Sequence, residues 1–347
     1  MLKTLLPCLV LTAALAAERP PAALRGVDVY RSAHLDPVQA ETRYGAQLKE
    51  YVLLRNAKEP ASAAKAEEIR RAVEADVRKL PGVAFATLRI TEYFTSVDHA
   101  MYAMFDIVDE EDRHRMAFAP APAGRTSDPL GLLATWKEYS ELGWALARQG
   151  LMPVDRPECP GFFSLWGGAT PELAALQQKL VDGVPGKLKE LREVLVHEAD
   201  GGKRSAALYA LSYAKDGGQL VEDCLRALKD PDGKVRVAAL EILSDVALYH
   251  RGLRIDLERV LAALDDPRGE VRSKVIGLLV PMSDDKAQRP RLLAAAPRLV
   301  ALLKLRQPES SDLAYVVLSQ LSLKDFNRRD LDAWEQWAAA AASGKDE

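Results

Sequence analysis

The chain has 347 residues, of which 48% are hydrophobic and 28% are charged, a composition typical of a globular protein with room for about two domains. Its formal net charge of -3 argues against nucleic acid as a partner, because such binding depends on clustered Lys and Arg. The same composition argues against wholesale disorder.

Residues 1–17 have the pattern of a secretory leader. Lys3 supplies the positive start, Leu5–Leu15 supplies the apolar core, and Ala14-Leu15-Ala16 forms a small-residue cleavage site. Cys8 lies inside the apolar core without the small residues before it that lipid attachment requires. No later stretch is long and uncharged enough to span a bilayer. We therefore expect an exported protein, periplasmic or extracellular, with no stable membrane insertion after removal of the leader.

After a linker at 18–24, residues 43–58 have an apolar spacing that fits a strand or a helix equally well. Pro60–Leu80 is a predicted helix, because a proline begins it and apolar residues recur every four positions along it. Val83–Phe94 alternates between apolar and polar residues, which predicts a half-buried strand.

Two further apolar runs, Met101–Val108 and Arg113–Phe118, flank the charged sequence Asp109–Asp112 and predict a hairpin in a small antiparallel sheet. Asp128-Pro129 then begins a helix that extends to about Gln149 and carries one apolar face. We expect this face to pack on the sheet. Pro153–Gly168 is rich in Pro and Gly but too apolar for a free linker, so we interpret it as the packed connection between two domains.

The second half contains a repeated element. Asp230-Pro231-Asp232-Gly233 and, 36 residues later, Asp266-Pro267-Arg268-Gly269 each stop one helix and allow a tight reversal. Both are followed within two residues by Val-Arg and an apolar helix face that one helix pair cannot cover by itself. A period of this length is typical of stacked helix pairs.

This Asp-Pro turn followed by Val-Arg resembles the HEAT repeats, which implies an α-solenoid that serves mainly as an interaction surface. The N-terminal half, through Phe105-Asp106-Ile107-Val108-Asp109, also looks like the start of exported bacterial HEAT-repeat proteins. The expected helix pairs are 185–198 with 203–214, 219–228 with 234–247, 255–264 with 270–282, and 291–305 with 311–323. A last helix at 329–342 is expected to cap the stack. The fourth turn has Gln307-Pro308 in place of the Asp-Pro sequence.

After removal of the leader only Cys159 and Cys224 remain. In an oxidising compartment they form either a disulfide that joins the two domains or two separate buried thiols, and the sequence leaves both possibilities open. Cys159 as a catalytic nucleophile is disfavoured, because no recognisable catalytic signature surrounds it.

Other candidates for chemistry have simpler structural interpretations. The acidic group Asp106, Asp109–Asp112 and His114 has no established calcium-loop spacing and equally fits a charged hairpin tip. Asp98-His99 is an acid/base pair in sequence only, since adjacent strand residues point to opposite faces. Arg236 and Arg272 are more simply explained as links between repeat turns than as a basic track. The remaining histidines have no spacing typical of a zinc site: His34, His197 and His250.

Together these patterns predict a mostly helical protein, with an α+β domain over 18–168 followed by an all-α HEAT-like α-solenoid over 169–347. We expect no catalytic, cofactor-binding or metal-binding residues and no cofactor. The expected function is that of a non-enzymatic scaffold for a protein or peptide partner whose identity the sequence does not give. Two alternatives stay open: a hydrolase-type enzyme with a site in the N-terminal domain or the interdomain crevice, and a self-associating structural envelope protein.

Overall fold

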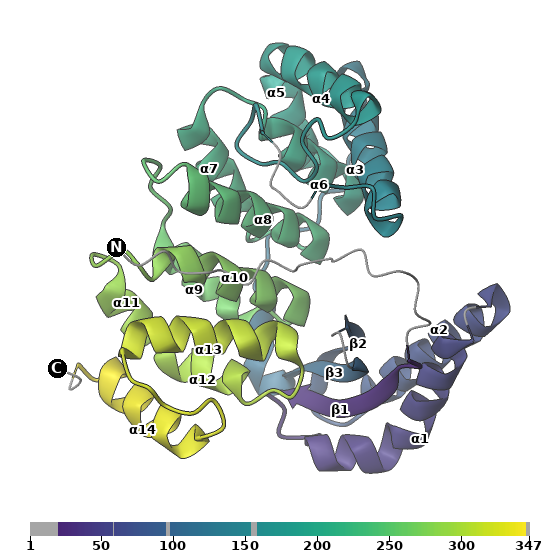
Figure 1. Ribbon diagram of the computed structural model, residues 1–347, viewed down its shortest axis with the longest axis vertical. Coiled ribbons are helices and arrows are strands. Elements are labelled where there is room, and N and C mark those ends of the chain that lie inside the picture. The colour runs from purple at the N-terminus through teal and green to yellow at the C-terminus, as the bar shows by residue number, and fades with distance from the viewer. Residues whose placement is uncertain (1–19, 58, 95–97, 154–157, 345–347) are drawn as a thin grey trace. The chain divides into compact units, whose positions relative to one another are not determined.

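The computed structural model describes residues 20–57, 59–94, 98–153 and 158–344, so the predicted leader at 1–17 lies outside the described residues. Over these ranges the chain is mostly helical, and three strands form one small sheet (Figure 1). The described residues form two compact units, which we call the helical unit (119–255) and the sheet unit (20–118 with 256–344). In the same ranges, no helix is both long and apolar enough to cross a bilayer.

The sheet has the strand order β1-β3-β2, with bounds Ala23–Tyr30 for β1, Val83–Phe94 for β2 and His99–Asp109 for β3. β2 pairs antiparallel with β3, and the strand predicted at Val83–Phe94 is confirmed as β2. β1 pairs parallel with β3, so the expectation of a purely antiparallel sheet is wrong. The sequence analysis missed β1, whose first two residues lie in the expected linker.

The hairpin predicted around Asp109–Asp112 is also wrong. After β3 the chain forms a short 3₁₀ helix, η1, over Glu110–Met116. Its first turn is acidic and its last turn is basic, an order that suits the partial charges at helix ends, and Glu110 pairs with Arg113 one turn later. The buried Arg115 then donates to the Ile107 carbonyl (2.9 Å), which holds η1 against the end of β3.

Helices α1 (Pro37–Asn56) and α2 (Pro60–Val77) cover one face of the sheet. α1 begins with a capping box in which Asp36 and Gln39 each satisfy the other's backbone N–H, and α2 begins at a proline. The core between these helices and the strands is made of buried apolar side chains: Val27, Leu35, Ala40, Tyr44, Leu48, Val73, Val77, Ala86, Leu88, Ala103, Phe105 and Ile107.

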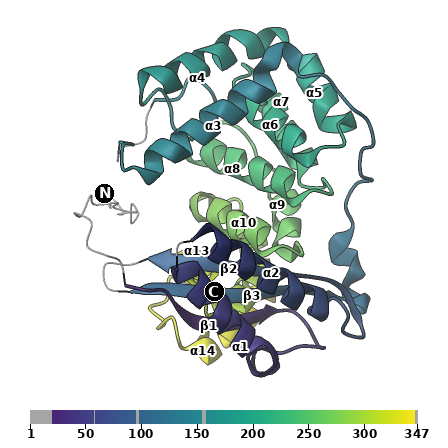
Figure 2. The same cartoon turned by 90° about the vertical axis from the view of Figure 1, so that its right-hand side faces the viewer.

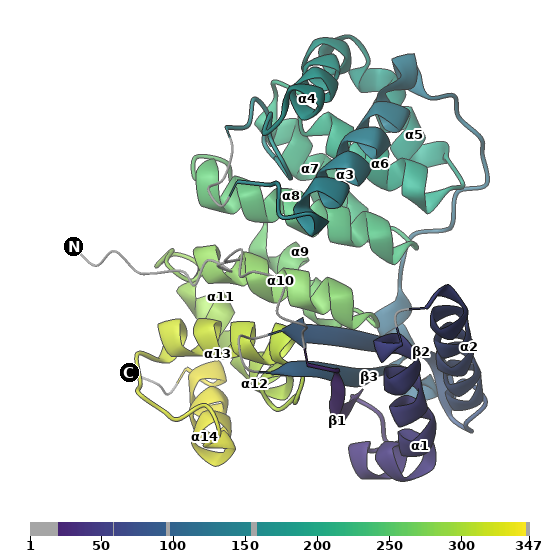
Figure 3. The ribbon, with the colours of Figure 1, turned by 45° about the vertical axis from the view of Figure 1, so that its right-hand side comes forward.

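The opposite face of the sheet packs against the turns that begin α10 (Gly269–Met282) and α13 (Pro308–Ser322), as Figure 3 shows. Because successive strand residues point to opposite faces, the residues between the core positions of β1 and β3 point this way. Two of them are carboxylates, Asp28 and Asp106, and both are buried. A buried carboxylate needs close partners, and each of these finds them in a helix turn.

Asp106 binds the turn before α10. One oxygen accepts from the Gly269 backbone N–H (2.7 Å), and the other accepts from the Arg272 guanidinium (2.5 Å). The Asp106 and Arg272 side chains are each only 1% exposed. The same guanidinium donates to the Asp266 carbonyl (2.7 Å) and lies 3.6 Å from the ring centroid of Tyr30, a cation–π contact.

Asp28 completes the turn before α13. In the turn before α10, the carboxylate of Asp266 accepts from the N–H two residues later, that of Arg268 (2.8 Å). Leu305 holds the corresponding position three residues before α13 and has no acceptor. Asp28 of β1 supplies the missing carboxylate, because it accepts from the backbone N–H groups of Arg306 (3.0 Å) and Gln307 (2.9 Å). Burial raises the pKa of Asp28, and these two donors lower it.

In the C-terminal part of the sheet unit, α10 packs against α13 and η4, and α13 packs against α11 and α12. Trp334 of α14 is fully buried, and α14 packs on α11 and α12, as a capping helix should. The Asp330 side chain caps α14 by accepting from the Ala333 N–H (3.2 Å). The bounds are Leu257–Ala262 for α9, Ala263–Asp265 for the 3₁₀ helix η4, Arg289–Ala294 for α11, Ala296–Leu303 for α12 and Leu331–Ala342 for α14.

In the helical unit, helices follow one another from α3 to α8. α3 was expected on the sheet, but it packs against α4 and α6, as Figure 2 shows, so that prediction is wrong. Its Trp136 stacks on Tyr209 of α6 (4.6 Å between ring centroids), an aromatic contact that favours packing of α3 on the helices. The bounds are Pro129–Gly131 for η2, Leu132–Arg148 for α3, Pro171–Gly183 for α4, Val184–Gly186 for η3, Leu188–His197 for α5, Gly201–Leu211 for α6, Gly217–Ala227 for α7 and Gly233–Tyr249 for α8.

The helix pairs α5–α6 and α7–α8 are linked at their turns. Arg204 of α6 forms a two-pronged ion pair with Asp230 (2.6 and 2.8 Å), which lies in the turn between α7 and α8. Arg236 of α8 donates to the Asp230 carbonyl (2.8 Å), in the same way that Arg272 binds the Asp266 carbonyl. Both Arg236 and Arg272 are 1% exposed, so neither can form part of a surface track for an acidic ligand.

The two units do not follow the predicted division, which placed the domain boundary at residue 168. Residues 119–168 belong with the helices that follow them, and the last helices of the chain belong with the sheet. The physical reason lies in α3, which covers helices, and in the strand carboxylates, which bind the turns of α10 and α13. Cys159 and Cys224 are both in the helical unit and are not joined by a disulfide. Burial raises the pKa of Cys224 well above its ordinary value.

Removing the Asp106 carboxylate tests the ion pair. Asp106→Ala leaves the Arg272 guanidinium buried without its acidic partner, so we expect a loss of about 3–5 kcal/mol in unfolding free energy. Urea denaturation of the full chain measures the loss. Glu110→Ala, which removes an exposed carboxylate a few residues away, is the control and should change stability by less than about 0.5 kcal/mol. Equal stability of the two variants would contradict the ion pair's role.

Candidate functional site

A groove in the helical unit is a candidate binding surface. It has a volume of about 350 Å³ and lies where α5 and α7 meet the turn before α8. Its walls are mainly apolar, and Val196 on α5 is 59% exposed there. The lining residues are Ala119, Pro120, Pro122, Arg192, Leu195, Val196, Asp223, Arg226, Ala227, Asp230, Pro231 and Val235.

Ala119, Pro120 and Pro122 line one wall of the groove and belong to residues 119–126, which we call the proline segment. Its backbone is bound at both ends: the Ala119 N–H donates to the Lys229 carbonyl (2.7 Å), and the Gly124 carbonyl accepts from the Ala199 N–H (2.8 Å). Gly124 is required here, because a Cβ would lie 2.5 Å from the His197 carbonyl oxygen. The helix turns therefore already hold an extended, proline-containing backbone.

Glu198 fixes the far end of the proline segment. Although it is only 2% exposed, its carboxylate accepts from the Thr126 N–H (2.8 Å) and hydroxyl (2.9 Å) and from the Asp200 N–H (3.0 Å). The backbone donors of Thr126 and Asp200 lower the pKa of Glu198 to about 2. The carboxylate is consequently ionised at neutral pH.

The polar edge of the groove is an ion-pair network. Asp223 of α7 is buried and accepts from Arg192 of α5 (2.8 Å) and from Arg226 of α7 (2.6 Å). The Arg226 side chain remains 61% exposed. The groove thus combines an apolar floor with an arginine that can reach a partner's carboxylate.

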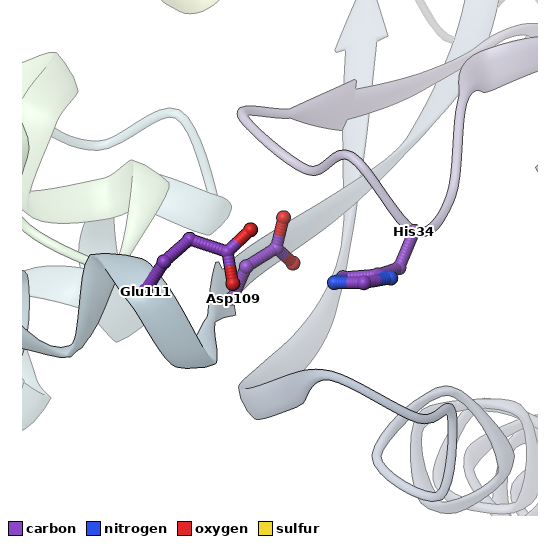
Figure 4. A group of neighbouring side chains, drawn as sticks. All are labelled: His34, Asp109 and Glu111. Atoms are coloured by element: carbon purple, nitrogen blue, oxygen red, sulfur yellow. The ribbon is translucent and has the colours of Figure 1, made fainter.

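The acidic group considered in the sequence is divided by the fold. Asp106 binds Arg272, whereas Asp109 and Glu111 lie close to His34, on the loop between β1 and α1 (Figure 4). One ligand atom from each of these three residues lies within 4.8 Å of the others. His114, the histidine that the sequence suggested, is not part of this group.

Asp98 and His99 do not form a dyad. Asp98 forms an ion pair with Arg25 (2.8 Å). The His99 ring instead contacts Glu92 through Nε2 (2.6 Å) and the Pro20 carbonyl through Nδ1 (2.8 Å), so it ties the start of the described chain to the sheet. Asp98 lies just before β3 rather than in it, so the strand argument of the sequence analysis does not apply to this pair.

Cys159 lies at a separate cavity of about 580 Å³ in the helical unit. Its thiol donates to the Phe163 carbonyl (3.0 Å), and the Gly161 N–H donates to its sulfur (3.4 Å). A cysteine nucleophile needs a nearby base, and the described residues that line this cavity include no histidine: Glu158, Cys159, Pro160, Gly168, Ala169 and Gln177. His250, also in this unit, instead packs edge-on against Phe162.

Sequence reasoning missed both the groove and the group around His34. The sequence analysis made no use of Ala119-Pro120-Ala121-Pro122, although two prolines at alternate positions already indicate an extended segment. His34 lies about 75 residues before Asp109 in sequence, and only the parallel pairing of β1 with β3 brings them together. No protein-family model, curated protein or solved structure matches the chain.

The pKa of Glu198 predicts an acid-sensitive proline segment. Because its pKa is about 2 rather than the ordinary 4.5, its contribution to stability is fully present above pH 4.5 and is lost as the pH falls toward 2. We expect the Thr126 and Asp200 amides to lose protection against hydrogen exchange over that range, measured relative to the intrinsic exchange rate at each pH. In Glu198→Gln the same amides should show no such transition, and an identical transition in this variant would contradict the assignment.

Proposed function

We propose that this protein is an exported, non-enzymatic scaffold whose helix pairs are HEAT-like repeats and whose groove beside the proline segment binds an extended segment of a partner protein. The stacked pairs are supported by the link from Arg204 to the next turn at Asp230. They are also supported by the matching contacts that Arg236 and Arg272 make with their own turns. Export follows from the leader pattern at 1–17.

The observation that carries the proposal is the proline segment itself. It adds backbone hydrogen bonds to the helix turns and presents Pro120 and Pro122 to the groove, so this surface is compatible with an extended chain. A partner segment alongside it would gain contacts with the exposed Val196 and with Leu195. Prolines in the partner would favour binding, because an already extended backbone loses less entropy.

The exposed Arg226 at the groove edge favours a carboxylate in the partner segment. Its guanidinium already shares Asp223 with Arg192, and its high exposure leaves donors available to a second acceptor. The proposed partner is therefore an extended, proline-containing segment that carries an Asp or Glu.

Binding of synthetic peptides tests this function. We expect the full chain to bind a subset of fluorescently labelled peptides that contain alternate prolines and one acidic residue, measured by fluorescence polarisation. Val196→Asp places a charge in the apolar floor and should weaken binding of that subset at least tenfold, about 1.4 kcal/mol.

Leu151→Asp is the matched control, because Leu151 is also 59% exposed in the same unit but does not line the groove. It should leave peptide binding unchanged, and circular dichroism should show that both variants are folded. The proposal is wrong if no peptide binds more tightly than about 1 mM, or if Leu151→Asp weakens binding as much as Val196→Asp does.

A further inference from the structure

We infer that His34, Asp109 and Glu111 form a zinc site in the sheet unit, although the sequence led us to expect no metal-binding residue. Figure 4 shows the His34 ring directed toward the two carboxylates, with Asp109 at the end of β3 and Glu111 in η1. The three candidate ligand atoms lie within 4.8 Å of one another. The site is independent of the peptide groove, which belongs to the other unit.

The charges around the group favour a cation. Asp109 is 4% exposed, and buried carboxylates are normally paired with a cation or bound to a metal. In the part of the chain that the structure describes, no basic side chain forms an ion pair with Asp109 or Glu111. The nearby arginines are engaged elsewhere, Arg113 with Glu110 and Arg31 with Asp112 and Asp265. Two carboxylates therefore adjoin an imidazole with no opposite charge to balance them.

Hydrogen bonds orient the buried ligand. The Asp109 carboxylate accepts from the Ser32 hydroxyl (2.9 Å) and from the Ala33 N–H (2.6 Å). The same hydroxyl accepts from the His34 N–H (3.0 Å), so one serine connects the two ligand-bearing residues. Each carboxylate oxygen has a second lone pair, and contacts of this kind hold metal ligands in place.

A glycine gives the imidazole its position. Gly82 has a φ of 81° and lies directly beneath the His34 ring, where a Cβ would overlap with the imidazole. The Gly82 carbonyl also accepts from the Glu110 N–H (2.8 Å), which fixes the turn before β2 beside the start of η1. Three segments distant in sequence thus meet around the ligand atoms.

The ligand chemistry indicates zinc rather than calcium. Imidazole nitrogen and carboxylate oxygen are both zinc ligands, and three such ligands with water complete four-coordinate zinc, whereas calcium takes six or more oxygens. Tetrahedral zinc with bonds of about 2.1 Å separates its ligand atoms by about 3.4 Å. The ligand atoms would approach one another by up to about 1.4 Å, and the exposed side chains of His34 and Glu111 can adjust to close the site.

Zinc titration of the untagged full chain, stripped of metal with a chelator, tests the site. We expect isothermal titration calorimetry to give one Zn²⁺ per chain, and Co²⁺ to give the strong visible absorption of a tetrahedral complex. His34→Ala and Glu111→Gln alter exposed residues and should leave the fold intact. Each should weaken Zn²⁺ binding by more than about tenfold.

His114→Ala and Glu110→Gln are the matched controls, because they change the same residue types in the same 3₁₀ helix outside the group. They should bind Zn²⁺ as the unaltered chain does. The inference is overturned if the unaltered chain binds no Zn²⁺, if the controls weaken binding as much as the ligand variants do, or if Ca²⁺ binds more tightly than Zn²⁺.

Discussion

The sheet unit depends on the buried contact between Arg272 and Asp106. Arg272 lies in the first turn of α10, and its guanidinium is buried. Its charge would be unbalanced if β3 did not supply the carboxylate of Asp106. Tyr30 covers the face of the same guanidinium from the neighbouring strand β1. This constraint explains why a small sheet and the last helices of the chain fold as one unit, although residues 119–255 separate them in sequence.

The sequence was informative where structure depends on local pattern. The helix at 60–77, the strand at 83–94 and the helices on either side of Asp230 and Asp266 follow from periodicity, caps and Asp-Pro turns, and all are present. The sequence pattern did not predict contacts between residues that are far apart in the sequence. Asp28 and Asp106 look like ordinary polar strand positions until their distant donors are known, the Arg306 and Gln307 N–H groups for Asp28 and Arg272 for Asp106. β1 is a strand only because β3 lies beside it.

The candidate sites follow the same division. Two prolines at alternate positions in Ala119-Pro120-Ala121-Pro122 favour an extended segment, but the sequence does not show which helix turns this segment contacts. The acidic residues near 110 were noticed as possible ligands, but the histidine beside them is His34 rather than His114, because the strand pairing and not the sequence distance brings ligands together. The proposed peptide groove lies in the helical unit, and the inferred zinc site lies in the sheet unit.

Native-state hydrogen exchange tests most directly whether strand carboxylates join the sheet to the C-terminal helices. If they do, the amides of β1, β3, α10 and α13 open with one common free energy as urea is added, and Asp28→Ala lowers that value equally in all four elements. If the carboxylates are incidental, α10 and α13 will keep their protection in Asp28→Ala while the strands alone exchange faster. That second result would contradict the account.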